Sequence, residues 1–248
     1  MLGPADDADH DSHSSIEHWS QAQDPRTVAR WRRRIVYKQI AWRLTFGLAE
    51  TLKRALDIAG SIFALLCFSP IFLLTALLIK LEDRGPIYFK QMRVGRGGKA
   101  FPMMKFRSMV VDADKMKDAL MSQNQHGGGG VTFKIKNVPR ITRVGLFIRK
   151  YSIDEFPQFF NVLLGHMSLV GPRPSLPREV TRYKAWHLRR LKVKPGITCL
   201  WQIGGRGDIN FEGQVRLDLQ YIASQSLWGD IVILIKTIPA VLAGKGAY

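Results

Sequence analysis

Two adjacent carboxylates, Asp154 and Glu155, are the residues of this chain best suited to chemistry. A basic pair, Arg149 and Lys150, precedes them, and an apolar run follows that ends in a Gly-Pro-Arg-Pro turn around Arg173. Cations on both sides of the acids would hold an anionic substrate that two carboxylates alone would repel. The segment therefore predicts a site for an anion.

A structural role for the same acids is also open. Ser152 and Glu155 have the spacing of a capping box, which predicts that both acids lie in the first turn of a helix continuing to Leu164. In that turn they would complement the helix dipole. Free backbone N–H groups at the same helix start would also favour a bound phosphate. Local sequence is compatible with both roles.

The overall charge of the chain points to anionic partners. The 248 residues include 37 Lys and Arg against 20 Asp and Glu, a formal net charge of +17. This balance suits nucleic acid, anionic lipid head groups or phosphorylated substrates. Cys67 lies in an apolar run and Cys199 is the second of two cysteines, so we expect no disulfide and a reducing compartment.

The composition changes sharply near the N-terminus. Residues 1–25 are rich in Asp, His and Ser and poor in apolar side chains, which predicts a disordered tail. Residues 26–50 form a basic segment with Trp31, Tyr37 and Trp42 interleaved, which is typical of a helix lying on an anionic membrane. The same composition suits nucleic acid, so this segment leaves both partners open.

An uncharged run from Ile58 to Ile79 favours the membrane, because it is long enough to cross a bilayer as a helix. Ser69 and Pro70 lie near its middle, where Pro bends a helix and the Ser hydroxyl can bond a carbonyl that the bend exposes. Both flanks are basic, which places both ends in the cytoplasm. We expect a re-entrant helix over residues 56–81; a kinked full span and a buried soluble helix are the alternatives.

Residues 86–107 alternate in the manner of a β-hairpin, with a Gly-rich turn from Gly95 to Lys99. The turn lacks the spacing of a phosphate-binding loop and the Ser or Thr that follows its Lys. Lys105 and Arg107 are two residues apart, so on one strand they would share a face and could reach one anion.

The motifs of the chain, taken in order, resemble those of the bacterial sugar transferase family. These are the monotopic phosphoglycosyl transferases, which start exopolysaccharide, O-antigen or glycoprotein glycan assembly. The resemblance covers about residues 51–248 and rests on KRALDIAGSIFALLCFSP, RKYSIDEFPQFFNVLLGHMSLVGPRP, KPGIT, WQIGGRGD, LDLQYI and the terminal GAY. One departure is Cys199, which follows PGIT where the family usually has Gly.

The resemblance implies a reaction: transfer of a sugar-1-phosphate from a UDP-sugar to undecaprenyl phosphate, with release of UMP. It implies that Asp154 attacks the β-phosphate to form a covalent phosphosugar intermediate and that Glu155 binds the required Mg²⁺. It also implies a break of the membrane helix at Ser69 and Pro70. The substrate-binding residues that it implies are Arg149, Arg173, Arg206, Lys105, Arg107 and Asp218.

The fold that this resemblance implies is α+β and mostly helical. We expect a membrane-embedded re-entrant helix, interfacial helices and a small β-hairpin around a cytoplasmic catalytic site, with residues 51–248 as the catalytic domain. The site would face the cytoplasm at the bacterial inner membrane, with the inner leaflet, rather than nucleic acid, as partner. A membrane-surface scaffold or nucleic-acid binder is the competing class, but it leaves the Asp-Glu and Gly-Pro-Arg-Pro motifs without a purpose. No residue selects among glucose, galactose and N-acetylated sugars.

Overall fold

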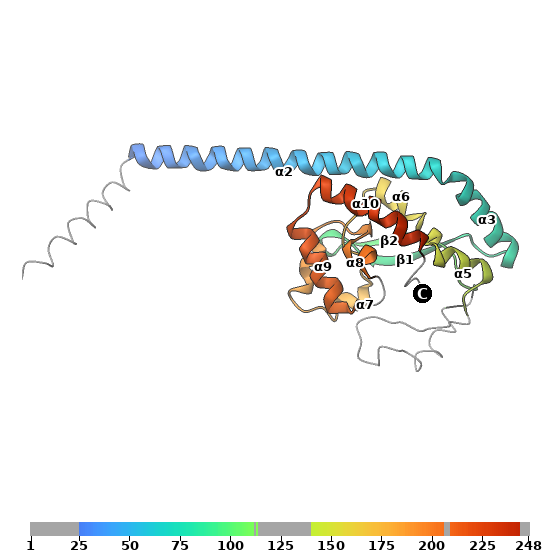
Figure 1. The fold of residues 1–248 in the computed structure, drawn as a ribbon. Coiled ribbons are helices and arrows are strands. Elements are labelled where there is room, and N and C mark those ends of the chain that lie inside the picture. Colours follow the sequence, from blue (N-terminus) through green and yellow to red (C-terminus); the bar gives the residue numbers. More distant parts are fainter. Residues whose placement is uncertain (1–24, 112, 114–139, 206–208, 244–248) are drawn as a thin grey trace, which may run out of the picture. The chain divides into compact units, whose positions relative to one another are not determined.

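A computed structural model describes residues 25–111, 113, 140–205 and 209–243 of the chain (Figure 1). The described part is mostly helical with two small sheets, as expected for an α+β protein. Its elements are α2 (Pro25–Cys67), α3 (Ser69–Asp83), β1 (Tyr88–Val94), η1 (Arg96–Gly98), β2 (Ala100–Phe106), α5 (Arg143–Lys150), η3 (Ile153–Glu155), α6 (Gln158–Leu163), β3 (Ser168–Val170), α7 (Pro177–Val180), η4 (His187–Lys192), β4 (Gly196–Thr198), α8 (Leu200–Gly204), α9 (Phe211–Ala223) and α10 (Leu227–Leu242).

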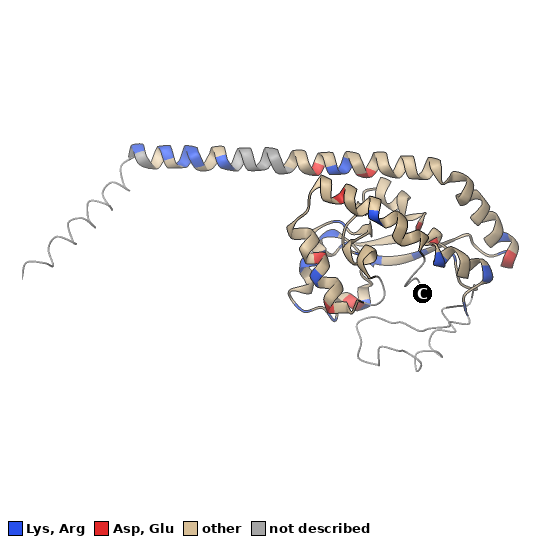
Figure 2. Ribbon diagram, viewed as in Figure 1, with Lys and Arg blue, Asp and Glu red and all other residues tan. Residues whose placement is uncertain are grey.

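The chain divides into two compact units, residues 1–51 and 52–248. The first described turns of α2 belong to the first unit and carry a dense series of Lys and Arg side chains, shown in blue in Figure 2. The predicted tail, residues 1–25, lies outside the described residues except for Pro25.

The apolar run is broken where the sequence predicts. Helix α2 ends at Cys67 and α3 begins at Ser69, with the hydroxyl of Ser69 donating to the carbonyl of Leu66 at 2.8 Å. Pro70 lies in the first turn of α3, where a missing N–H leaves no helical bond unmade. In the described residues no helix by itself has the length and apolarity to cross a membrane. Residues 47–67 and 69–83 meet these criteria jointly and are bent by 62°.

Three polar side chains of α2, all within residues 52–248, bond to other elements of the second unit. Lys53 bonds the Asp230 carboxylate at 2.5 Å, and Arg54 donates to the carbonyl of Val162 at 2.6 Å. The carboxylate of Asp57 accepts from the backbone N–H of Leu169 at 2.9 Å. These buried or half-buried bonds hold the base of the broken helix against α6, β3 and α10.

The predicted hairpin is confirmed. Strands β1 and β2 are antiparallel, with Tyr88 opposite Phe106 and Val94 opposite Ala100. Gly97 and Gly98 in the connecting turn have φ angles of 69° and 77°, which residues other than glycine rarely adopt. The hairpin thereby places β2 beside η3 and α6.

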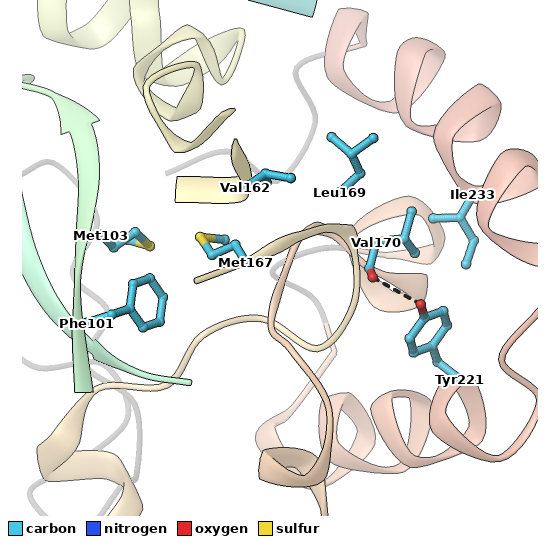
Figure 3. Close-up of a cluster of buried hydrophobic side chains, with 8 residues drawn as sticks. All are labelled: Phe101, Met103, Val162, Met167, Leu169, Val170, Tyr221 and Ile233. Carbon is cyan, nitrogen blue, oxygen red and sulfur yellow. Dashed lines mark hydrogen bonds between the residues drawn. The ribbon is translucent and has the colours of Figure 1, made fainter. Parts of the chain in front are cut away.

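The core of the second unit joins this hairpin to the helices. Its largest cluster of buried side chains is drawn in Figure 3: Phe101, Met103, Val162, Met167, Leu169, Val170, Tyr221 and Ile233. The hydroxyl of Tyr221 donates to the carbonyl of Val170 at 3.0 Å, which satisfies two polar groups inside this cluster (Figure 3).

Strands β3 and β4 pair in parallel, and their ends approach closely. An added Cβ at Gly196 would lie 2.1 Å from the backbone nitrogen of Gly171. Gly171 opens the Gly-Pro-Arg-Pro turn, so this contact also fixes where the turn begins.

We predict that Gly196→Ala destabilises the protein by at least about 2 kcal/mol, because the new methyl group forces two backbones apart. Thermal unfolding in detergent measures the loss. Gly204→Ala is the matched control, since a Cβ there meets nothing within 4 Å; equal stability of the two variants would contradict the prediction.

Candidate active site

The carboxylate pair lies in a turn rather than at the start of a long helix. Asp154 and Glu155 belong to the three-residue 3-10 helix η3, and α6 begins only after Pro157. Ser152 has a φ of 56° and its side chain makes no capping bond; its N–H bonds the carbonyl of Arg149 at 3.1 Å. The predicted capping box is therefore wrong, and so is a single helix from Ser152 to Leu164. Both acids do lie in the first turn of a helix, the 3-10 helix η3, in which the N–H of Glu155 donates to the carbonyl of Ser152 at 3.1 Å. The phosphate site at this helix start stays a prediction.

Lys105 bridges the two acids. Its ammonium lies 2.7 Å from Oε1 of Glu155 and 3.3 Å from Oδ2 of Asp154, and Arg173 adds a longer contact of 3.5 Å to Oε1 of Glu155. Burial tends to raise the pKa of Glu155, but Lys105 and Arg173 outweigh it and lower this pKa to about 2. Burial dominates at Asp154 and raises its pKa, against the opposing charge of Lys105. The two neighbours thus differ in acidity.

Asn161 positions Lys105, a role that the sequence did not suggest. Its buried amide accepts from the backbone N–H of Met104 at 2.8 Å and donates to the carbonyl of Pro102 at 2.8 Å. Both bonds are made to the backbone of β2, so Asn161 fixes this strand to α6 directly beside Lys105. Short-range sequence patterns give no signal for such a long-range side-chain bond.

Arg93 is a further cation at this site that sequence reasoning missed. It donates to the carbonyl of Pro174 at 2.9 Å and to Gln91, and burial together with the nearby charge of Arg173 lowers its pKa to about 10. The register of the hairpin shows how Arg93 could have been found. Lys105 lies opposite Phe89, and Arg93 is four residues after Phe89, so Arg93 and Lys105 are on the same face of the hairpin.

The remaining predicted residues have different surroundings. Arg149 lies at the end of α5. Burial lowers its pKa, and the charge of Asp154 opposes this change without outweighing it. Arg107 lies beyond the end of β2 and pairs with Asp83, so it and Lys105 contact different carboxylates instead of one anion. Asp218 is buried in α9, 2.6 Å from Arg190. Arg206 lies outside the described residues.

Cys199 adopts an extended backbone with a φ of −153°, a conformation open to any residue. Its buried thiol donates to the amide oxygen of Gln202 at 3.0 Å. A glycine is therefore not required at this position by the backbone.

A cleft of about 1550 Å³ is lined by both charged and apolar side chains. Among its charged residues, the cations Lys105, Arg93, Arg149 and Arg173 surround Asp154 and Glu155, which favours a ligand with more than one negative charge. The apolar side chains that line the cleft include Phe63, Cys67, Phe68, Ile71, Leu234, Ile238 and Leu242. The cleft can therefore receive a molecule that has both anionic and apolar parts.

Comparison with known proteins agrees with this class of site. Residues 48–244 match the model of the family described as bacterial sugar transferase. The chain is 50% identical over 196 residues to the galactosyl transferase CpsE of Streptococcus agalactiae, covering 79% of this chain and 43% of that protein. It is 40% identical over 198 residues to the exopolysaccharide production protein ExoY of Rhizobium meliloti, covering 79% and 88%.

A third relative is the UDP-glucose:undecaprenyl-phosphate glucose-1-phosphate transferase of Escherichia coli, 41% identical over 211 residues, which cover 82% of this chain and 42% of that protein. The chain thus spans less than half of two of these relatives and most of ExoY. The chain belongs to the bacterial sugar transferase family, which confirms the resemblance of its motifs.

The low pKa of Glu155 predicts a pH-dependent contribution to stability. Because this pKa falls from 4.5 to about 2 on folding, the ionised group stabilises the fold above about pH 4.5, and this is lost as the pH falls towards 2. Glu155→Gln should lower the free energy of unfolding by about 1–3 kcal/mol at pH 7, and the difference from wild type should shrink towards pH 2.

Denaturant unfolding at several pH values measures this difference, and a difference independent of pH would contradict the assignment. Glu212→Gln is the control, because the Glu212 side chain is 40% exposed and water screens its ion pairs.

Proposed function

We propose that the protein transfers a sugar-1-phosphate from a UDP-sugar to undecaprenyl phosphate and releases UMP, as the first step of exopolysaccharide or O-antigen-type glycan assembly. The name of the Escherichia coli relative states this reaction for UDP-glucose, and that of ExoY states exopolysaccharide production. The observation that carries the proposal is the buried pair of unequal acids, Asp154 and Glu155, among clustered cations in a cleft that is also lined by apolar side chains.

Asp154 acts as the nucleophile in two displacements at one phosphorus atom. Its ionised Oδ attacks the β-phosphorus of the UDP-sugar, and the bond from that phosphorus to the bridging oxygen breaks, so that UMP leaves with the electron pair. An oxygen of undecaprenyl phosphate then attacks the same phosphorus and displaces Asp154. The products are undecaprenyl diphosphosugar and the free carboxylate, so one site serves both substrates in turn.

The cations of the cleft reduce the repulsion between a carboxylate and a diphosphate. Lys105 and Arg149 favour the ionised form of Asp154 over the neutral acid that burial favours. Arg173 and Arg93 hold phosphate oxygens and the departing UMP, since guanidinium groups bind phosphate bidentately. Arg107 and Arg206 stay predictions of the family resemblance.

The same carboxylates fit a magnesium ion. The described residues contain no cluster of three or more His, Cys, Asp or Glu that could hold a metal. Magnesium needs no such cluster, because it binds through one or two carboxylates, substrate phosphates and retained water. Glu155, with its low pKa, would be the main protein ligand, and the ion would neutralise charge on the diphosphate.

We place the site at the cytoplasmic face of the bacterial inner membrane, with the broken helix α2–α3 inserted as a re-entrant anchor and residues 51–248 as the catalytic domain. The 62° bend at Ser69 supports this, as do exposed apolar side chains on both of its arms, such as Phe63, Leu73 and Leu81. The basic segment 26–50 would lie on anionic head groups. The apolar side chains of the cleft would then face the lipid substrate.

Asp154→Asn should abolish the reaction, because the amide cannot form the acyl phosphate. UMP release should fall at least about 10³-fold, and incubation with UDP-sugar alone should no longer add a phosphosugar to the intact mass. A panel of UDP-sugars with undecaprenyl phosphate and magnesium provides the assay. Glu212→Gln, an acid outside the cleft lining, serves as the control; wild-type turnover by Asp154→Asn would exclude this nucleophile.

Labelling of single cysteines tests the topology. In a Cys67→Ser background, cysteines at the exposed positions Arg30 and Lys90 should both react with an impermeant reagent from the cytoplasmic side only. Inside-out vesicles and whole cells present the two sides. Labelling from opposite sides would show a spanning helix and exclude the re-entrant arrangement.

A further inference from the structure

Asp218 has no access to a substrate, since it is 1% exposed, yet it lies at the start of a chain of polar contacts that leads to Arg173. Its carboxylate is 2.6 Å from the guanidinium of Arg190, which is 5% exposed. Arg190 donates to the hydroxyl of Tyr183 at 3.1 Å and to the backbone carbonyl of Arg173 at 3.4 Å. One guanidinium thus joins α9 to the Gly-Pro-Arg-Pro turn.

Two parts of the fold bond the residues that follow Arg173. The Tyr183 hydroxyl donates to Oγ of Ser175 at 2.7 Å. From the hairpin, Arg93 donates to the carbonyl of Pro174 at 2.9 Å, and the N–H of Val94 donates to the carbonyl of Ser175 at 2.9 Å. Arg190 and Tyr183 therefore act together with the hairpin to fix the turn.

The side chain of Arg173 has a neighbour of its own in Trp201. The guanidinium of Arg173 lies over the Trp201 ring, 6.0 Å from its centre. Burial raises the pKa of Asp218 to about 6, with Arg190 opposing the rise. At neutral pH the carboxylate is therefore mostly ionised and able to pair with Arg190.

We propose that Asp218 and Arg190 are positioning residues, which fix the backbone at Arg173 so that its guanidinium meets the diphosphate of the donor. This role rests on the proposed function for its substrate. It replaces direct substrate binding at Asp218, the role implied by the family resemblance, with an action through Arg190.

A double-mutant cycle with Arg173 tests the positioning role in the full-length protein. Arg190→Lys keeps the positive charge beside Asp218 but cannot bridge three acceptors at once, so kcat/KM for the UDP-sugar should fall by about 10²-fold, the effect of a small misplacement. In an Arg173→Ala background the same change should cost less than about 3-fold. Equal losses in the two backgrounds would show a merely structural role and overturn the proposal.

Tyr183→Phe provides a milder variant for the case that Arg190→Lys folds poorly. It removes only the hydroxyl between Arg190 and Ser175, and we expect a loss of about 3- to 10-fold that disappears in the Arg173→Ala background. Arg189→Ala, on the exposed side of η4, is the matched control and should retain wild-type kinetics. Wild-type kinetics for Tyr183→Phe and Arg190→Lys would refute the positioning role.

Calorimetric binding of inorganic pyrophosphate separates this proposal from the proposed function. Arg190→Lys and Arg173→Ala should weaken pyrophosphate binding by a similar factor, and the double variant no further. If the wild type releases no UMP from any UDP-sugar but shows this binding pattern, the proposed function fails and the positioning role stands. If UMP release is normal and pyrophosphate binding is unaffected by Arg190→Lys, the positioning role fails alone.

Discussion

Two neighbouring carboxylates that are taken out of water repel each other, and the fold must supply positive charge from several directions to keep both in place. Lys105 comes from the hairpin, Arg173 from the turn after β3, and Arg149 from the end of α5. Helix α5 directly precedes η3 in the sequence, whereas Lys105 and Arg173 are brought to η3 by the fold. The hairpin, the parallel strand pair and the short helices can thus be understood as supports that deliver cations to one point.

The features that the sequence predicted correctly are encoded by neighbouring residues. The bend at Ser69 follows from the Ser-Pro pair, and the hairpin follows from alternating side chains around glycines. The family was recognisable because several motifs occur in order. The acids of the site and three of its cations were found in this way, although their roles as nucleophile and metal ligand rest on the resemblance.

Features that depend on contacts between distant residues were not predictable. Ser152 has the side chain of a capping residue, but that side chain makes no capping bond, and only the backbone of Ser152 bonds to α5 and η3. Asn161 and Arg93 act through partners about 60 and 80 residues away, and neither has a distinctive local pattern. The burial of Asp218 is likewise a property of the packed core, and it is one of the observations behind the positioning role proposed for that residue.

The bonds of Lys53, Arg54 and Asp57 to the rest of the second unit have a consequence for the re-entrant arrangement proposed above. From Asp57 to the break at Cys67 the helix rises about 15 Å, half of a hydrocarbon core that is roughly 30 Å thick. In that arrangement an arm of this length would reach the middle of the bilayer. Because the base of the arm is bonded to the core of the second unit, the length of the arm would also set how far that core stands from the middle of the bilayer.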